Sequence, residues 1–302
     1  MLKVGSRAST LATSQAELVV RLIAEAGVDC ELVLFETKGD KILDRALDAI
    51  GDKGLFTTEL ENALLSGAID IAVHSLKDLP TALMPDLAIG AYLLPEDPRD
   101  VLVASGTSWE TLPQGAVIGT SSLRRKAFLS ALRPDLKIVP VRGNLQTRVE
   151  KWRAQGWDGL ILAAAGVHRL QWQDLIASYL DPWLCVPSPG QGILAAEVRK
   201  DNGRVLELLA PLNNQRAEQA ARAERACLAE LRGGCQIPFG AYAESAGPGR
   251  LRLRGKVGDI AGQTIITEDG EGDSGNPEKL GEAVGRKLIA QGALTLLSGD
   301  PS

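Results

Sequence analysis

Hydrophobic and polar positions in the first 200 residues alternate between short β-rich runs and amphipathic helical stretches. The β-rich runs predict eight strands, over residues 3–5, 31–36, 69–73, 87–92, 101–104, 116–118, 137–141 and 160–163. The amphipathic stretches predict four helices, over residues 11–26, 57–65, 123–132 and 145–154. Ser9 or Thr10 would cap the first helix, and Gly27 would end it. This alternation predicts α/β layers with largely parallel sheets.

The pattern changes after about residue 213. A long helix is predicted over 215–231, and three strands follow over 237–244, 251–257 and 263–267. A Gly- and Asp-rich stretch, 269–276, then leads to a final helix over 278–291. This order predicts a separate α+β domain. Two Pro-rich segments, 95–98 and 187–192, are typical of a chain that crosses into a second domain and returns.

Composition and cysteine spacing favour a reduced, cytoplasmic globular protein. Hydrophobic residues make up 45% of the 302 residues, and the longest apolar run, 160–167, is far shorter than a membrane span. The chain begins with a strand-like segment, and no signal peptide is visible. The cysteines form no C-x-x-C pair, so neither a disulfide framework nor a zinc site is expected.

Charge is concentrated in residues 120–170. This segment holds ten basic residues and three acids, a local charge of +7, although the whole chain carries −5. The contrast indicates a local site for an anion, the alternative being a solvated, Arg-rich helix face.

The basic residues follow the ends of three predicted strands. The turns and the helix starts after them hold hydroxyls, glycines and arginines: Thr120, Ser121, Ser122, Arg124 and Arg125, then Arg142, Gly143, Asn144 and Arg148, and finally Arg169. Residues 119–122 are expected to cap the next helix, and Asn144 the one after it. Ligands of α/β sheets bind beyond the carboxyl ends of strands, where helix N-termini attract anions. Arginine is disfavoured at a helix N-terminus unless an anion binds there. We therefore expect a ligand with several carboxylates or phosphates.

Nucleic acid is the main alternative ligand, because Trp152 and Trp157 could stack on bases. Against it, aromatic residues are only 4% of an acidic chain. The chain has no phosphate-binding P-loop. Residues 190–195 match the dinucleotide pattern G-x-G-x-x-A, but they follow Pro-Ser-Pro and not a strand.

Three further constellations could carry chemistry. Asp78 follows a strand and could stabilise a developing cation or carry a proton, the alternative being a loop salt bridge with Lys77; nearby His74 is expected to be structural. Cys235 follows two glycines, which favours an accessible nucleophile, the alternative being an inert buried thiol. Residues 45–56 read as a lid, at whose end Phe56 could stack on a flat ligand or cap the core.

Taken together in order, these blocks resemble the porphobilinogen deaminase (hydroxymethylbilane synthase) family along essentially the whole chain. The matching blocks are residues 5–7, 39–41, 51–56, 70–80, 96–100, 119–125, 142–144, 147–148, 190–192 and 233–236.

The resemblance implies that four porphobilinogen molecules are joined head to tail, with release of ammonia, to give linear hydroxymethylbilane for haem and other tetrapyrroles. It implies a dipyrromethane cofactor joined by a thioether to Cys235, with Asp78 as the catalytic carboxylate. Cofactor contacts would come from Ser75, Lys77, Thr120, Ser121, Ser122, Arg124, Arg125 and Gln191. Substrate contacts would come from Arg7, Phe56, Arg142, Arg148 and Arg169, and no metal is implied.

The resemblance also implies two α/β domains like those of type II periplasmic binding proteins, plus a smaller α+β domain with a three-stranded antiparallel sheet. The expected boundaries are 1–94 with 193–212, then 98–189, then 215–302. A monomer that binds neither nucleic acid nor membrane is expected. The rival hypothesis, a non-catalytic solute-binding protein of this architecture, would need neither Cys235 nor the third domain.

Overall fold

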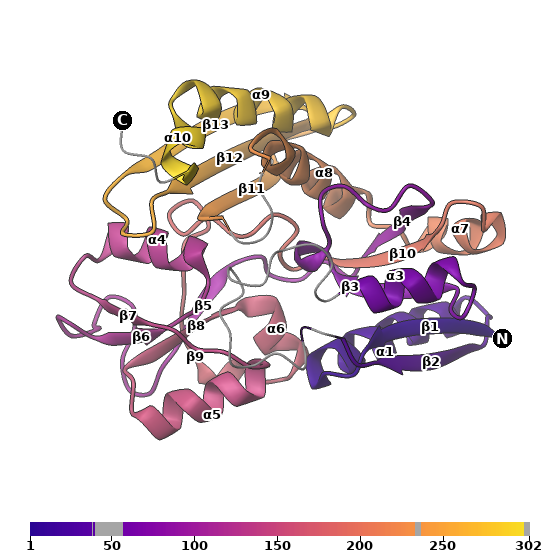
Figure 1. Ribbon diagram of the computed structural model, residues 1–302, viewed down its shortest axis with the longest axis horizontal. Coiled ribbons are helices and arrows are strands. Elements are labelled where there is room, and N and C mark those ends of the chain that lie inside the picture. Colours follow the sequence, from indigo (N-terminus) through magenta and orange to yellow (C-terminus); the bar gives the residue numbers. More distant parts are fainter. Residues whose placement is uncertain (38, 40–56, 233–236, 299–302) are drawn as a thin grey trace. The chain divides into compact units, whose positions relative to one another are not determined.

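A computed structural model describes residues 1–37, 39, 57–232 and 237–298 (Figure 1). The chain divides into two compact units, Met1–Glu96 with Gly192–Glu218 and Asp97–Gln191 with Gln219–Ser302. Two of the three unit boundaries fall inside the Pro-rich segments and the third follows Glu218; the finer division into three domains stays a prediction. Within the described residues, no helix is both long enough and apolar enough to cross a membrane.

The first unit is built on a five-stranded sheet in the order β2-β1-β3-β10-β4. Its strands are β1 (Leu2–Arg7), β2 (Cys30–Phe35), β3 (Ile71–Ser75), β4 (Leu87–Leu93) and β10 (Leu194–Arg199). β1 pairs in parallel with β2 and β3, whereas β10 is antiparallel to both of its neighbours. Helices α1 (Thr10–Glu25) and α7 (Gly203–Leu209) bury one face, and α3 (Thr58–Leu65) packs in a second cluster.

The second unit holds another five-stranded sheet, in the order β7-β6-β8-β5-β9. Its strands are β5 (Asp100–Val103), β6 (Val117–Gly119), β7 (Lys137–Val139), β8 (Gly159–Ala163) and β9 (Ile176–Tyr179). Leu102 packs in the cluster with α4 (Leu123–Leu132), whereas Val101 and Val103 pack in the cluster with α5 (Leu145–Gln155) and α6 (Ala164–Arg169). Alternate residues of β5 thus serve the two faces of the sheet.

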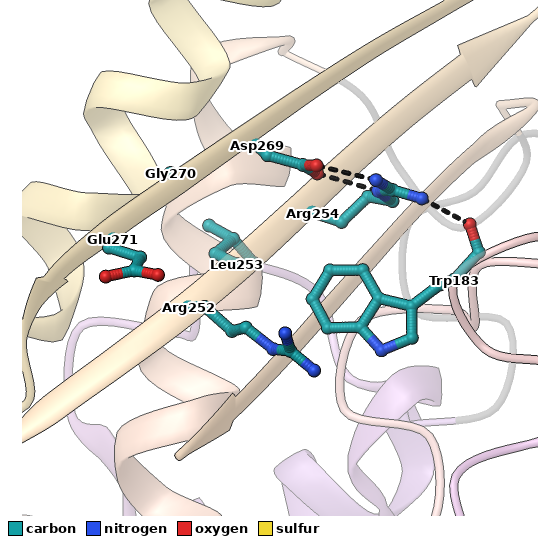
Figure 2. Close-up of a pocket in the computed structure, with 7 residues that line it drawn as sticks. All are labelled: Trp183, Arg252, Leu253, Arg254, Asp269, Gly270 and Glu271. Carbon is teal, nitrogen blue, oxygen red and sulfur yellow. Dashed lines mark hydrogen bonds and ion pairs between the residues drawn. The ribbon is translucent and has the colours of Figure 1, made fainter. Parts of the chain in front are cut away.

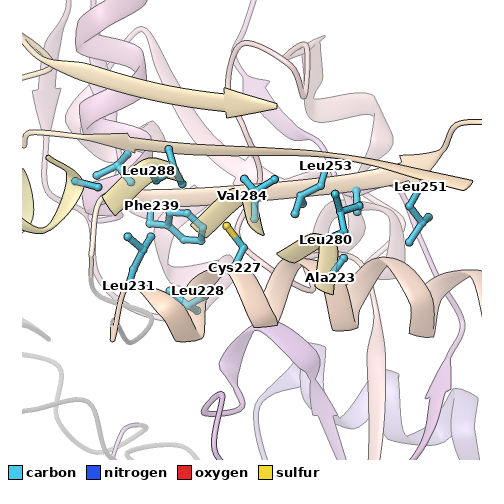
Figure 3. Close-up of a cluster of buried hydrophobic side chains, with 14 residues drawn as sticks. Ala223, Cys227, Leu228, Leu231, Phe239, Leu251, Leu253, Leu280, Val284 and Leu288 are labelled. Atoms are coloured by element: carbon cyan, nitrogen blue, oxygen red, sulfur yellow. The ribbon is translucent and has the colours of Figure 1, made fainter. Parts of the chain in front are cut away.

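The second unit also contains the antiparallel sheet β11-β12-β13. Its strands are β11 (Phe239–Ser245), β12 (Arg250–Gly258) and β13 (Ile265–Asp273), and its helices are α8 (Gln215–Glu230), which begins in the first unit, α9 (Pro277–Ala290) and α10 (Ala293–Ser298). Figure 1 shows α9 lying along β12 and β13. Figure 3 shows Cys227 of α8 in the buried cluster between helices and sheet, beside Val284 of α9.

The predicted α/β class with a small antiparallel sheet is confirmed, and four of the five strands in each large sheet run in one direction, as the prediction of largely parallel sheets requires. Each large sheet is mixed, because β10 in one and β5 in the other run antiparallel to both neighbours. The segment predicted as a Gly- and Asp-rich stretch also begins as strand, since β13 extends to Asp273. Its glycines are needed there: a Cβ on Gly270 would lie 2.7 Å from Val284 Cγ2 of α9.

A close approach of α8 and α9 makes Gly281 a sensitive position. A Cβ there would lie 2.2 Å from the backbone oxygen of Ala223. We expect Gly281→Ala to lower the free energy of unfolding by about 1–3 kcal/mol, because overpacking forces the helices apart. Gly203→Ala is the control, since nothing lies within 4 Å of a Cβ there. Equal urea midpoints for the two variants would contradict this packing.

Candidate functional site

In the first unit, four of the predicted site residues gather where two parallel strands end. Arg7 is the last residue of β1, and Ser75 is the last of its neighbour β3. Lys77 and the exposed Asp78 follow in a 3₁₀ turn, Leu76–Asp78. Parallel strands place their carboxyl ends at one sheet edge, so these side chains belong to a common edge. The Ser75 hydroxyl donates to Gln15 Oε1 of α1 at 3.2 Å.

His74 lies inside this sheet and has a buried acidic partner. Its Nε2 is 3.1 Å from Glu197 Oε2 of β10, and both side chains are nearly inaccessible. Burial, followed by repulsion from Glu197, raises the pKa of nearby Glu61. The pairing matches the structural role expected for His74.

In the second unit, the turn that leads from β6 into α4 is the first basic turn, and hydroxyl groups fix its backbone. Ser122 caps α4 as predicted, accepting a hydrogen bond from the N–H of Arg125 at 3.4 Å. Ser121 Oγ donates to Val141 O at 2.8 Å and accepts from Val141 N–H at 2.9 Å. Thr120 is buried, and its hydroxyl accepts from Ser122 N–H at 3.2 Å. The O–H group of Ser121 is therefore already used by the backbone of Val141.

The second basic turn leads from β7 into α5. Asn144 caps the helix as predicted, accepting from Thr147 N–H at 2.9 Å. Gly143 has a φ of +113°, which a side chain would disfavour. The Arg148 Nε–H donates to Gly143 O at 2.8 Å. Half-buried Arg142 makes no side-chain hydrogen bond or ion pair with the described part of the chain, so its guanidinium is the one best placed to meet a ligand.

Arg169 does not share this placement. The chain forms the short helix α6 directly after β8, and Arg169 is the last residue of that helix. A cation at a helix C-terminus is favoured by the helix dipole, so Arg169 needs no bound anion for its stability.

Arg124 and Arg125 differ most from the expectation of open cationic arms. Both are buried, and both pair with Asp100, the first residue of β5. Arg124 Nη1 lies 2.7 Å from Asp100 Oδ2, and Arg125 Nη2 lies 2.8 Å from Oδ1. Gln191, which is also a predicted cofactor contact, binds the same carboxylate: its Nε2 donates to Asp100 Oδ1 at 2.9 Å. Three predicted ligand contacts thus meet on one carboxylate.

The second Pro-rich segment, 187–192, is linked through Glu224 to the small antiparallel sheet. Buried Glu224 of α8 accepts from Gly190 N–H at 2.7 Å and from Ala243 N–H of β11 at 2.9 Å. A Cβ on Gly240 would lie 2.5 Å from Val186 O, so strand and segment touch closely. Because α8 leads by sequence toward Cys235, these contacts tie the crossing to the helix that precedes the candidate nucleophile.

Two other features carry none of the predicted contacts. Trp152 is buried and donates from Nε1 to Trp157 O at 2.9 Å, so it does not form the stacking surface that nucleic acid would need. A pocket of about 480 Å³ lies on β12 and β13 beside Trp183 (Figure 2). Its Arg254 already pairs with Asp269 at 2.6 Å and Arg252 with Glu244, so these cations are neutralised.

Phe56, the predicted lid at 45–56 and Cys235 with its flanking glycines lie outside the described residues. Among the described cysteines, burial raises the pKa of both Cys185 and Cys227 to about 12. Burial also raises the pKa of Cys30. These three thiols are therefore poor nucleophiles at neutral pH.

Two family models together match nearly the whole chain. The model described as "Porphobilinogen deaminase, dipyromethane cofactor binding domain" matches residues 2–207, and "Porphobilinogen deaminase, C-terminal domain" matches residues 218–290. The chain belongs to the porphobilinogen deaminase family.

The chain is also similar to curated porphobilinogen deaminases over nearly their whole lengths. The porphobilinogen deaminase of Carboxydothermus hydrogenoformans is 48% identical over 297 residues, covering 97% of this chain and 95% of that protein. The Moorella thermoacetica porphobilinogen deaminase is 48% identical over 299 residues, covering 98% and 95%. That of Desulfitobacterium hafniense is 49% identical over 298 residues, covering 98% and 96%.

Solved structures with similar backbones are more distant. A nutrient-binding protein from Burkholderia cenocepacia bound to methionine has a TM-score of 0.43 and 15% identity, covering 69% of this chain and 90% of that one. The methionine-binding protein MetQ has a TM-score of 0.45 and 13% identity, covering 72% and 90%.

No role was predicted from the sequence for Asp100, which pairs with Arg124 and Arg125, or for Glu224, which holds Gly190 and Ala243. One signal was available for Asp100: two adjacent arginines entering a helix beside a buried sheet require an acid, and Asp100 begins an apolar strand. Glu224 gave no comparable signal, because it lies in a helix with several other charged residues.

Glu224 should make stability depend on pH. Burial raises its pKa from the usual 4.5 of a glutamate to about 8. Below about pH 4.5 its contribution is fully present; as pH rises toward 8 the unfolded chain releases a proton that the folded chain keeps. The free energy of unfolding should therefore fall over this window, by up to about 1.4 kcal/mol per pH unit.

Urea unfolding of the wild type, Glu224→Gln and exposed Glu207→Gln between pH 5 and 8 checks this. We expect the slope to flatten in Glu224→Gln and to persist in Glu207→Gln. An unchanged slope in Glu224→Gln would show that Glu224 is ionised throughout.

Proposed function

We propose that the chain joins four porphobilinogen molecules head to tail, releasing ammonia, to give linear hydroxymethylbilane for tetrapyrrole biosynthesis. This proposal rests on the family models, which match residues of both compact units. The chain also contains Asp78, the basic turns and Cys235, which the proposed reaction needs. We also propose that it acts as a cytoplasmic monomer without nucleic-acid partners. The burial of Trp152 supports the absence of nucleic-acid partners, because a buried indole cannot stack on bases.

The residues present fit a dipyrromethane. Each pyrrole ring brings an acetate and a propionate, and guanidinium groups pair well with carboxylates. Arg142 offers a half-buried guanidinium without a partner among the described residues, and the Asp100 cluster retains a positive charge. Carried over from the family, the holding residues are Cys235 by a thioether and Ser75, Lys77, Thr120, Ser121, Ser122, Arg124, Arg125 and Gln191 by polar contacts.

When bound, the dipyrromethane would supply the electron-rich pyrrole end to which the substrate is added. Asp78 is proposed to act on the substrate itself. Loss of ammonia from porphobilinogen leaves a cation, and a carboxylate held at the sheet edge lowers the energy of that charge. Leu76 helps to fix the turn, since its N–H donates to Ile193 O at 2.9 Å.

Arg7, Phe56, Arg142, Arg148 and Arg169 are proposed to bind the carboxylates and rings of incoming porphobilinogen. The support differs between them. Arg142 has a free guanidinium within the described chain, whereas Arg148 is partly committed to Gly143 O. We therefore expect Arg142 to contribute more to substrate binding than Arg148.

Intact-protein mass tests the covalent attachment directly. The purified chain should exceed its sequence mass by one dipyrromethane, and Cys235→Ser should remove the excess, because only a thiol forms the thioether. Cys227→Ser is the matched control and should keep it, since Cys227 is buried in the core. Active protein of unmodified mass would contradict the proposal, and ligand binding without an adduct would favour a solute- or nucleic-acid-binding protein.

Replacement of Asp78 tests the catalytic carboxylate. Asp78→Asn should lower kcat by about 10²–10³-fold, because the amide is nearly isosteric but cannot offset a cation. Exposed Asp86→Asn in the same unit is the control and should keep wild-type turnover. Release of ammonia from porphobilinogen measures the rate. Near-normal turnover by folded Asp78→Asn would rule out this role.

A further inference from the structure

Asp100 is an inaccessible carboxylate surrounded by donors. It begins β5 on the face shared with Leu102 and α4, and it is 0% exposed. Oδ1 accepts from both arginines and from Gln191 Nε2. Oδ2 accepts from Arg124 Nη1 at 2.7 Å and from Cys185 Sγ at 3.6 Å. Both oxygens are therefore fully used inside the protein.

The two guanidiniums are held at further points as well. Arg124 Nη1 also donates to Val186 O at 2.7 Å, and Arg125 Nη1 donates to Ile161 O at 3.0 Å. Val186 lies just before the returning crossing, and Ile161 lies in β8. Each guanidinium is thus fixed between a carboxylate and a backbone carbonyl, and its rotamer cannot change without breaking both contacts.

The net charge of the cluster explains why a single carboxylate pairs with two arginines. Two cations and one anion leave a net charge of +1 in a buried place, enough to attract a carboxylate without two unpaired cations. Burial alone would raise the pKa of Asp100, but the charges of Arg124 and Arg125 hold it well below its usual range. Asp100 is therefore ionised at neutral pH.

We propose that Asp100 is a positioning residue for cofactor loading: it holds Arg124, Arg125 and Gln191 as one rigid unit that presents fixed N–H donors to the cofactor's carboxylates. This inference rests on the proposed function for the identity of the ligand. Asp100 has no accessible surface and touches no ligand itself. Its effect reaches the ligand only through the three side chains it orients.

The test combines stability with covalent loading. Asp100→Asn, Arg125→Gln and the double variant are compared with Val103→Ala, which shortens another fully buried residue of the same strand. Urea midpoints report stability. Intact mass reports the fraction that carries the dipyrromethane excess and the rate at which the unmodified fraction gains it on addition of porphobilinogen.

We expect Asp100→Asn to load about 100-fold more slowly than wild type, since misplaced contacts cost about that factor. Val103→Ala should load at the wild-type rate despite its lower midpoint. The double variant should have a higher midpoint than Asp100→Asn, because it removes one of two uncompensated buried cations, yet it should still load slowly. If Asp100→Asn does not fold, the double variant is compared with Arg125→Gln alone: slower loading of the double variant is expected, and equal loading of the two would overturn the inference.

Loading of Asp100→Asn at the rate of Val103→Ala would overturn the inference, and so would a double variant no more stable than Asp100→Asn. Failure of the proposed function looks different. In that case the wild type itself carries no mass excess, while the midpoints still report whether Asp100 and Arg125 are coupled.

Discussion

The buried ion cluster around Asp100 is the constraint on which the second unit depends. Removing a carboxylate from water is unfavourable unless donors replace the lost hydration, and here guanidinium, amide and thiol groups from three chain segments do so. β5, α4, the segment at Cys185 and the crossing at Gln191 must all be in place for the charge to be compensated. A single carboxylate thereby couples sheet, helix and crossing, and it sets the direction of the donors that a multi-carboxylate ligand would meet.

In both units, polar residues divide into those whose hydrogen bonds fix the backbone and those that stay available to a ligand. Ser121, Ser122 and Asn144 close the strand-to-helix turns, and the basic residues stand on those closed turns. Glu224 fastens the returning crossing to β11. What remains uncommitted among the described side chains includes Arg142 and exposed Asp78, one cation and one anion. This division suits an enzyme that binds carboxylates and stabilises a transient positive charge.

Local patterns predicted much of this architecture, because the caps Ser122 and Asn144 and the apolar periods act over a few residues. Mixed sheets escaped prediction, since the direction of β5 and β10 depends on long-range pairing. The predicted strand 263–267 ends before β13 does, because glycines are typical of loops. Only the fold shows that α9 packs closely against the glycines of β13. The same reason hid the pairing of Arg124 and Arg125: sequence shows two cations near a helix start, but only the fold shows that Asp100 lies beneath them.

Solvent exchange of the Arg125 Nε–H measures the central contact most directly. This proton is donated to Asp100 Oδ1 at 3.1 Å in a buried site, whereas Arg153 is exposed on α5. Nitrogen-15 NMR of the arginine side chains in the purified protein can follow both. A far slower exchange at Arg125 than at Arg153 is predicted, because the cluster must break before water reaches the proton. Equal exchange rates would contradict a rigid Asp100 cluster and the positioning that follows from it.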